Sequence, residues 1–232
     1  MSDTRAPDLA RLAGHLADTT RAAFVLALLD GRAWTVTELA AHAGVATSTA
    51  TEHLNRLREA GLVGERRQGR HRYVQIADAT VAQLVEDMAS HLPPTRPAAT
   101  TLRAVTAHEA LVRGRTCYDH LAGQLGVALT DALTVRGLLD QRSGFALTAE
   151  GAAFLTGPLG VDAGVLVPGR RPVVRACLDW TQRRTHLAGV AGAEICRQFM
   201  GRSWVERIGS GRAVRVTPSG RRALHDLLDL QV

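Results

Sequence analysis

The sequence contains no lysine, only three cysteines and no long hydrophobic run. All 28 basic residues are therefore arginine. No stretch of 18 apolar residues occurs, so we expect no transmembrane helix. The first eight residues lack the basic-then-apolar pattern of a secretory signal. Cys117, Cys177 and Cys196 include no close pair, which argues against a disulfide framework and predicts a reducing, cytoplasmic location.

The sequence also lacks the common signatures of catalysis. It has no Gly-rich phosphate loop, no Gly-x-Ser-x-Gly elbow and no metal-hydrolase His motif. We therefore expect a protein that is not an enzyme.

The length of 232 residues predicts one large or two small domains, and 46% apolar residues can build a substantial core. The net charge is +6, but residues 1–92 hold 10 arginines against 11 acidic residues, whereas residues 93–232 hold 18 against 11. A positive field favours polyanions. Because the excess of positive charge lies in residues 93–232, net charge alone only weakly supports DNA binding. The sequence motifs provide the main evidence.

The strongest pattern runs from Thr37 to Ile76 and predicts a helix-turn-helix followed by a hairpin. Thr35 or Thr37 is suited to cap a first helix, which Gly44 ends by a left-handed turn. Thr47 or Ser48 is then expected to cap a second helix, which runs to about residue 60. In helix-turn-helix proteins the second helix lies in the DNA major groove.

The second helix is amphipathic, with Ala50, Leu54 and Leu57 spaced along one face. Its other face is polar and rich in hydroxyl groups. We expect base-edge or phosphate contacts from seven residues of this helix: Thr47, Ser48, Thr49, Thr51, Glu52, His53 and Arg56.

Residues 65–76 predict a basic β-hairpin, with a turn at Gln68-Gly69-Arg70. Such a hairpin beside a recognition helix is a wing, and it typically contacts phosphates or the minor groove. Four arginines are the candidates: Arg66, Arg67, Arg70 and Arg72.

Amphipathic helices are expected on both sides of this region. Residues 9–29 show helical spacing with a break near Asp18, which is suited to cap the second segment. Residues 78–92 carry an apolar stripe that needs a surface to pack on. A second subunit is the obvious candidate, since two-fold dimers match palindromic operators.

Residues 9–92 resemble the ArsR/SmtB family of winged-helix repressors. Several short stretches carry the resemblance: Leu16-Ala-Asp-Thr-Thr-Arg21, Glu38-Leu-Ala40, Ser48 to His53-Leu54-x-x-Leu57, Ala60-Gly-Leu-Val63 and Gly69-Arg70-x-x-Tyr73. The resemblance implies a homodimer joined through the first and last helices of this domain. It also implies repression of transcription until an inducer binds.

The usual metal sites of that family are not expected in this chain. Metalloid sensors of the family often have a Cys-x-Cys pair where this sequence has Thr35 and Thr37. The family's other common site, on the last helix, is an Asp/His/His/Glu cluster. Here Asp87 and His91 stand four residues apart and would form only a weak pair, so a solvated helix face is the better interpretation.

Beyond a linker at residues 93–100, rich in proline, residues 101–232 contain an internal repeat. The motif His-Leu-Ala-Gly-x-x-Gly occurs at 120–126 and at 186–192, and a Thr-x-x-Gly-x-x-x-Leu motif begins at Thr148 and at Thr217. We expect an α-rich domain with two short hairpins. The repeat forms two degenerate, winged-helix-like copies at about 117–160 and 177–230. Each copy is expected to contain a helix, a second helix, a short strand and a Thr-capped helix.

This C-terminal domain, absent from short family members, is expected to sense a signal or to stabilise the dimer. The sensing candidates are Cys117, His120, Cys177 and Cys196; Cys117 and His120, at i and i+3, are expected on one helix face. Gathered thiolates would suit a soft metal or metalloid, and two would suit a redox switch. The opposing interpretation is that each cysteine is a small buried apolar residue. His120 and His186 recur at one repeat position, which favours a packing role over a ligand role.

The sequence thus predicts a sequence-specific DNA-binding regulator, a repressor released by an inducer. The inducer would be a metal, a metalloid or a small organic molecule. One alternative is a thiol-based sensor that uses the three cysteines, and another is an architectural DNA binder without an inducer.

Overall fold

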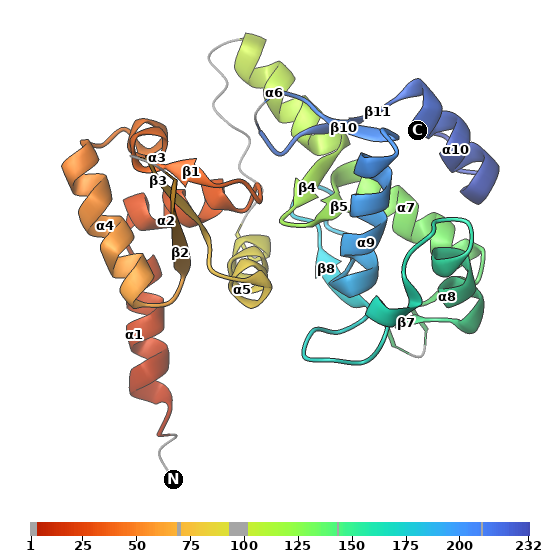
Figure 1. Cartoon of the computed structure of the whole chain (residues 1–232), viewed down its shortest axis with the longest axis horizontal. Coiled ribbons are helices and arrows are strands. Elements are labelled where there is room, and N and C mark those ends of the chain that lie inside the picture. The colour runs from red at the N-terminus through yellow and green to blue at the C-terminus, as the bar shows by residue number, and fades with distance from the viewer. Residues whose placement is uncertain (1–3, 69–70, 93–101, 143, 210) are drawn as a thin grey trace. The chain divides into compact units, whose positions relative to one another are not determined.

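The computed structural model describes residues 4–68, 71–92, 102–142, 144–209 and 211–232. The chain divides into two compact units, residues 1–86 and 87–232 (Figure 1). Helices dominate both units, and the strands form short antiparallel pairs, which confirms the expected fold class. In the described part of the chain no helix is both long and apolar enough to cross a membrane.

The first unit consists of helices and one three-stranded sheet. Its elements in order are α1 (Ala6–Leu16), α2 (Thr19–Leu28), β1 (Trp34–Thr35), α3 (Val36–Ala43), α4 (Thr47–Glu59), β2 (Val63–Gln68), β3 (His71–Ile76) and the first part of α5 (Ala79–Ser90), a helix whose last residues, from Asp87, belong to the second unit. Strand β3 lies between β1 and β2 and is antiparallel to both. Strand β1 was not predicted, because a two-residue strand is too short to show an alternating pattern in the sequence.

Local hydrogen bonds explain where the first helices begin. The Asp18 carboxylate accepts the backbone N–H of Arg21 at 3.0 Å and caps α2, as expected. Thr35 caps α3 in a capping box: its hydroxyl accepts the Glu38 N–H at 3.2 Å, and the Glu38 carboxylate accepts the Thr35 N–H at 2.7 Å. Gly44 ends α3 with a φ of 67°.

The expected cap of α4 was wrong. The N-cap residue is Ala46, which makes no side-chain capping bond, and Thr47 is the first residue of the helix. The Val45 N–H donates to the Ala40 carbonyl at 3.0 Å, so the turn closes early and the chain enters the helix at Ala46. The buried face of α4 is as expected, because Ala50, Leu54 and Leu57 are fully buried.

The second unit contains two copies of one arrangement after an initial helix α6 (Leu102–Arg113). The first copy is β4 (Arg115–Cys117), β5 (His120–Ala122), α7 (Gly123–Val135), β6 (Leu139–Asp140), β7 (Ala146–Leu147) and α8 (Ala149–Thr156). The second copy is β8 (Arg175–Leu178), β9 (Thr185–Ala188), α9 (Gly189–Gly201), β10 (Val205–Arg207), β11 (Val214–Val216) and α10 (Pro218–Leu228). A 3-10 turn, Ala163–Val165, lies between them.

Each copy therefore begins with a hairpin, where the sequence analysis expected a helix. Four two-stranded sheets, not two hairpins, occur among the described residues of this unit. Cys117 and His120 face each other across β4 and β5, with Tyr118 in the left-handed region at a φ of 55°. A spacing of three residues suits one helix face, but it equally suits the two sides of a two-residue turn.

The repeated glycines allow each helix to lie close to its own hairpin. Gly123 and Gly189 start α7 and α9 with φ values of 74° and 83°, which L side chains rarely adopt. A Cβ on Gly126 would meet the Leu121 carbonyl oxygen at 2.4 Å, and a Cβ on Gly192 would meet that of Leu187 at 2.5 Å. Any larger residue at these two positions would push the helix away from the hairpin.

The other repeated motif caps the last helix of each copy. The Thr148 hydroxyl accepts the Gly151 N–H at 2.9 Å, and the Thr217 hydroxyl accepts the Gly220 N–H at 3.0 Å, as expected. Apolar residues from both copies, including Leu129 and Phe199, belong to one hydrophobic core. The two copies therefore form a single folded unit.

Candidate nucleic-acid interface and buried Cys/His cluster

The polar face of α4 is open to solvent over its first two turns and again near its end. Thr47, Ser48, Glu52 and Arg56 are exposed, and Thr49 and Thr51 are partly exposed. The Thr51 hydroxyl also donates to the Thr47 carbonyl at 2.8 Å. Hydroxyl, carboxylate and guanidinium groups are thus displayed on the side of α4 opposite its buried leucines, which is the arrangement that base-edge contacts need.

His53 differs from the other expected contact residues. Its side chain is only 17% exposed, and its Nδ1 lies 3.6 Å from Asp18 Oδ1. The same nitrogen lies 3.4 Å from a guanidinium nitrogen of Arg21, whose side chain also donates to carbonyls at the end of α1. His53 therefore links α4 to the N-terminal end of α2 through Asp18 and Arg21.

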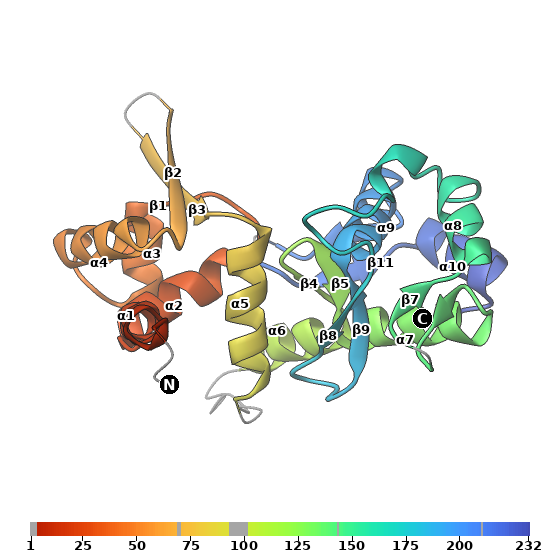
Figure 2. The ribbon, with the colours of Figure 1, turned by 90° about the horizontal axis from the view of Figure 1, so that it is seen from below.

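The hairpin of β2 and β3 projects from the first unit (Figure 2). Arg66 and Arg67 are exposed on β2, and Arg70 lies outside the described residues. Arg72 differs from Arg66 and Arg67, because its side chain forms an ion pair with the Glu65 carboxylate and donates a hydrogen bond to Asn55 Oδ1 at 3.0 Å. Since Asn55 belongs to α4, Arg72 ties the wing to the recognition helix.

The two family positions for metal carry other interactions in this protein. Thr35 is occupied as the cap of α3, and its hydroxyl donates to the Glu38 carboxylate at 2.8 Å. Within the second unit, the Asp87 carboxylate forms an ion pair with Arg175. A carboxylate held by an arginine is a weaker metal ligand than a free one.

A buried cluster in the second unit brings together one cysteine and one histidine from each copy. Cys117 and His120 are register partners across β4 and β5, and Cys177 and His186 are register partners across β8 and β9. One potential ligand atom from each residue lies within 4.8 Å of the others, and all four side chains are at most 5% exposed. Three of these residues were predicted as sensing candidates from the sequence, whereas for His186 a packing role was favoured over a ligand role.

The histidine rings meet in the middle of this cluster. Their Nε2 atoms are 3.1 Å apart, and the rings stack with centroids 5.0 Å apart. Each Nδ1 lies near a carboxylate: that of His120 is 3.3 Å from Asp119, and that of His186 is 3.7 Å from Asp179. Neighbouring carboxylates of this kind orient the histidines of metal sites.

Asp179 is itself fixed by a buried ion pair. Its Oδ2 lies 2.9 Å from an Arg115 nitrogen, and neither side chain is exposed. It also accepts backbone N–H groups from Gly123 at 2.6 Å and from Thr181 and Gln182 at 2.9 Å. Burial raises the pKa of Asp179, but Arg115 and these hydrogen bonds outweigh it and hold the pKa well below its usual range.

The two cysteines of the second copy, Cys177 and Cys196, have different surroundings. A hydrogen bond from the Cys117 thiol, opposed by burial and helped by the two imidazoles, holds the pKa of the Cys177 thiol far below its ordinary value. In contrast, burial raises the pKa of Cys196 to about 12, with a contribution from Asp119. Cys196 is part of the hydrophobic core and does not belong to the cluster.

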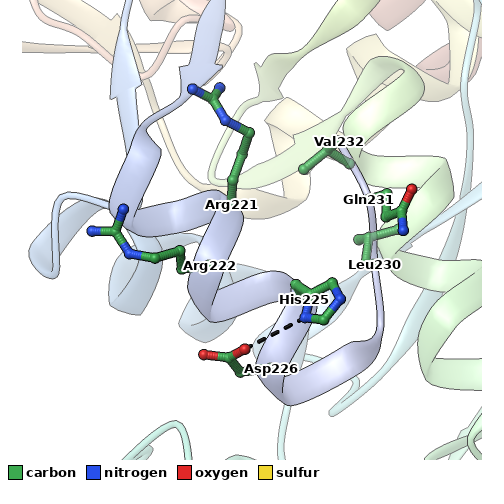
Figure 3. A pocket seen from close by; sticks show the side chains of 7 residues that line it. All are labelled: Arg221, Arg222, His225, Asp226, Leu230, Gln231 and Val232. Atoms are coloured by element: carbon green, nitrogen blue, oxygen red, sulfur yellow. Dashed lines mark hydrogen bonds and ion pairs between the residues drawn. The ribbon is translucent and has the colours of Figure 1, made fainter.

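An open surface hollow lies elsewhere in this unit. It lies between α10 and the residues that follow (Figure 3), and its volume is about 320 Å³. It is lined by Arg221, Arg222, His225, Asp226, Leu230, Gln231 and Val232. Elsewhere in the unit, the ring of Trp180 lies beneath Arg115, and that of Trp204 beneath Arg202.

A helix-turn-helix with an attached basic hairpin defines a winged-helix DNA-binding protein. A family model described as a helix-turn-helix domain matches residues 16–66. The HTH-type transcriptional regulator YdfF of Bacillus subtilis is 35% identical over 227 residues, which cover 97% of this chain and 99% of that protein. The chain belongs to the ArsR/SmtB family of winged-helix transcriptional regulators.

Other relatives match the first part of the chain. The HTH-type transcriptional regulator CmtR of Mycobacterium tuberculosis is 38% identical over 86 residues, or 37% of this chain and 72% of that protein. Among solved structures, the transcriptional repressor BigR of Xylella fastidiosa is 30% identical, covering 39% of this chain and 92% of that chain with a TM-score of 0.36. The cadmium sensor CmtR of Mycobacterium tuberculosis is 33% identical, covering 40% and 99% with a TM-score of 0.30.

Proposed function

We propose that this regulator is a homodimeric repressor that reads a palindromic operator through α4 and releases it when a signal reaches the second unit. The observation that carries the proposal is the exposed polar face of α4 beside a basic wing. Ser48, Glu52 and Arg56 supply side chains for base edges or nearby phosphates, whereas Arg66 and Arg67 supply charge for the backbone. No catalytic step is required of the chain.

Apolar side chains left at the surface support the dimer. Helix α1 has no buried residue, and its Leu9 is 68% exposed. On α5, Leu84 and Met88 are 36% and 46% exposed, and Leu92 just beyond it is 57% exposed. These three residues follow each other at intervals of four and form one stripe. A two-fold dimer would cover this stripe and place two recognition helices one DNA turn apart.

The interactions of Thr35 favour a signal that enters outside the DNA-binding unit. The Thr35 hydroxyl already forms hydrogen bonds with Glu38, so it is poorly placed to bind an inducer. Residue 35 also has no thiol. The second unit, in contrast, contains a buried cluster and an open hollow. The inducer would have to bind the DNA-incompetent dimer more tightly, with a coupling free energy of about 1–3 kcal/mol.

A footprint of the DNA upstream of the protein's own gene tests this proposal. We expect one protected palindrome whose half-sites are a helical turn apart, and higher expression from that promoter in a deletion strain. Glu52→Gln should alter the ratio of operator to random-DNA affinity, since a base contact contributes about 1–3 kcal/mol of discrimination. Glu59→Gln, also exposed on α4 but in its last turn, is the matched control.

Other outcomes would replace the proposal. Weak protection spread over any sequence would indicate an architectural DNA binder. Lower expression in the deletion strain would indicate an activator.

A further inference from the structure

The cluster of Cys117, His120, Cys177 and His186 has the composition of a tetrahedral metal site. It offers two sulfur and two nitrogen donors, a set that selects zinc-like, borderline-soft cations over magnesium or calcium. Two nitrogens bound to one tetrahedral zinc ion at about 2.0–2.1 Å stand about 3.3 Å apart. The two Nε2 atoms, at 3.1 Å, are already close to that separation.

The positions of the histidine nitrogens favour a bound cation. A carboxylate beside Nδ1 favours a proton on that nitrogen, and each ring has one there: Asp119 at 3.3 Å from His120, and Asp179 at 3.7 Å from His186, a distance too long for a hydrogen bond. Both Nε2 lone pairs then face each other in a buried space. A hydrogen bond between the rings would require either a second proton on one imidazole or an Nδ1 lone pair turned toward a carboxylate. A metal ion that both Nε2 atoms bind uses both lone pairs and requires neither.

We propose that these four residues bind one divalent, zinc-like cation that joins the two copies of the second unit. Both cysteines would bind the ion as thiolates, so that two negative charges balance the double positive charge and the centre is neutral. A neutral centre suits a site whose side chains are at most 5% exposed.

The site is closed, because four protein ligands complete a tetrahedron and leave no position for water or substrate. Closed sites of this kind stabilise folds. The ligands come in pairs from hairpin β4–β5 and hairpin β8–β9. Gly126 and Gly192 support this contact, because a Cβ at either glycine would lie 3.6 Å or 3.3 Å from the histidine Cβ of the other copy. The metal therefore links elements that are 66 residues apart.

The inference does not rest on the proposed repressor function, because its test needs no DNA. The full-length protein is purified under reducing conditions, and its metal content is measured by mass spectrometry. After chelation, Co(II) is titrated in and then displaced by Zn(II). We expect one metal ion per chain, a visible spectrum of tetrahedral Co(II) and a near-ultraviolet thiolate-to-cobalt band. Zn(II) should abolish both spectral features.

Variants of the chain identify the ligands. Cys117→Ser should remove the metal or weaken its binding at least a hundredfold and reduce the charge-transfer band. His186→Gln should weaken binding while both thiolate contacts remain. Cys196→Ser is the matched control, because it removes an equally buried cysteine from outside the cluster, and it should keep one metal ion per chain.

The wild-type measurement decides the proposal even if a variant fails to fold. Absence of bound metal, together with no thiolate-to-cobalt band on titration, would overturn it. So would a disulfide between Cys117 and Cys177 in protein whose thiols are trapped on lysis, if the reduced protein then bound no metal.

Discussion

The Nε2 atoms of His120 and His186 lie 3.1 Å apart, although 66 positions separate the two residues in the chain. Each histidine is also the cross-strand partner of a cysteine in its own hairpin. The internal repeat thus places two copies of a Cys/His pair against each other. A motif that looks like duplicated packing in the sequence becomes a four-residue site in the folded chain.

Removing metal should destabilise the second unit. At free Zn(II) about 100-fold above the dissociation constant, the bound ion contributes about 2.7 kcal/mol. For a unit of this size that corresponds to a melting-temperature shift of roughly 5–10 °C. Circular dichroism melts with Zn(II) and with chelator would measure the shift. Cys117→Ser should melt at the same temperature in both conditions; an equal shift in that variant would place the stabilising metal elsewhere.

Asp179→Asn should be strongly destabilising. The substitution leaves the fully buried Arg115 guanidinium without its carboxylate, a change that typically costs about 3–5 kcal/mol. Urea unfolding of the full chain measures it. Asp131→Asn is the control, because its ion pair with Arg184 is exposed and should contribute less than about 1 kcal/mol. Similar destabilisation of the two variants would contradict the assigned role of the buried pair.

Arg66→Ala combined with Arg67→Ala should weaken DNA binding on every sequence. These exposed wing arginines are expected to neutralise phosphates, so the slope of log affinity against log salt should fall by about 1 for each phosphate that is no longer neutralised. Fluorescence anisotropy on operator and random duplexes provides the measurement. Arg142→Ala combined with Arg197→Ala, two exposed arginines of the second unit, is the charge-matched control. Unchanged affinity for both duplexes would rule out the hairpin as a wing.

Met88→Glu should dissociate the dimer. Met88 is 46% exposed within the apolar stripe at α5, and burying a charge there opposes association. Analytical ultracentrifugation should show a dissociation constant raised by at least roughly tenfold. Val135→Glu is the control, because Val135 is 87% exposed at the end of α7, away from the stripe. A Met88→Glu protein that remains dimeric would require a different interface.

The sequence predicted the DNA-binding unit well, because its signals are local. Asp18, Thr35 and Gly44 act at the helix ends as their residue types suggest. Ala50, Leu54 and Leu57 are buried because helical periodicity alone determines that face. The cap of α4 was missed, since backbone hydrogen bonds in the turn decided where the helix begins.

The Cys/His cluster was only partly predictable. Cys117 and Cys177 were candidates by residue type, but a spacing of three residues cannot distinguish a helix turn from a hairpin turn. His186 joins them through tertiary contact between the copies, which no local pattern contains. The available signal was that both copies carry a cysteine ahead of the repeated histidine. The Arg115–Asp179 ion pair was not predicted for the same reason, because its partners are 64 residues apart and meet only through tertiary contact.

X-ray absorption spectroscopy of the Zn(II)-loaded full chain tests the metal centre between the repeats most directly. We predict a first shell of two sulfur atoms at about 2.3 Å and two imidazole nitrogens at about 2.0–2.1 Å. The Cys196→Ser protein should give the same shell. A shell of oxygen and nitrogen alone, or a sulfur count that falls in Cys196→Ser, would contradict the assignment.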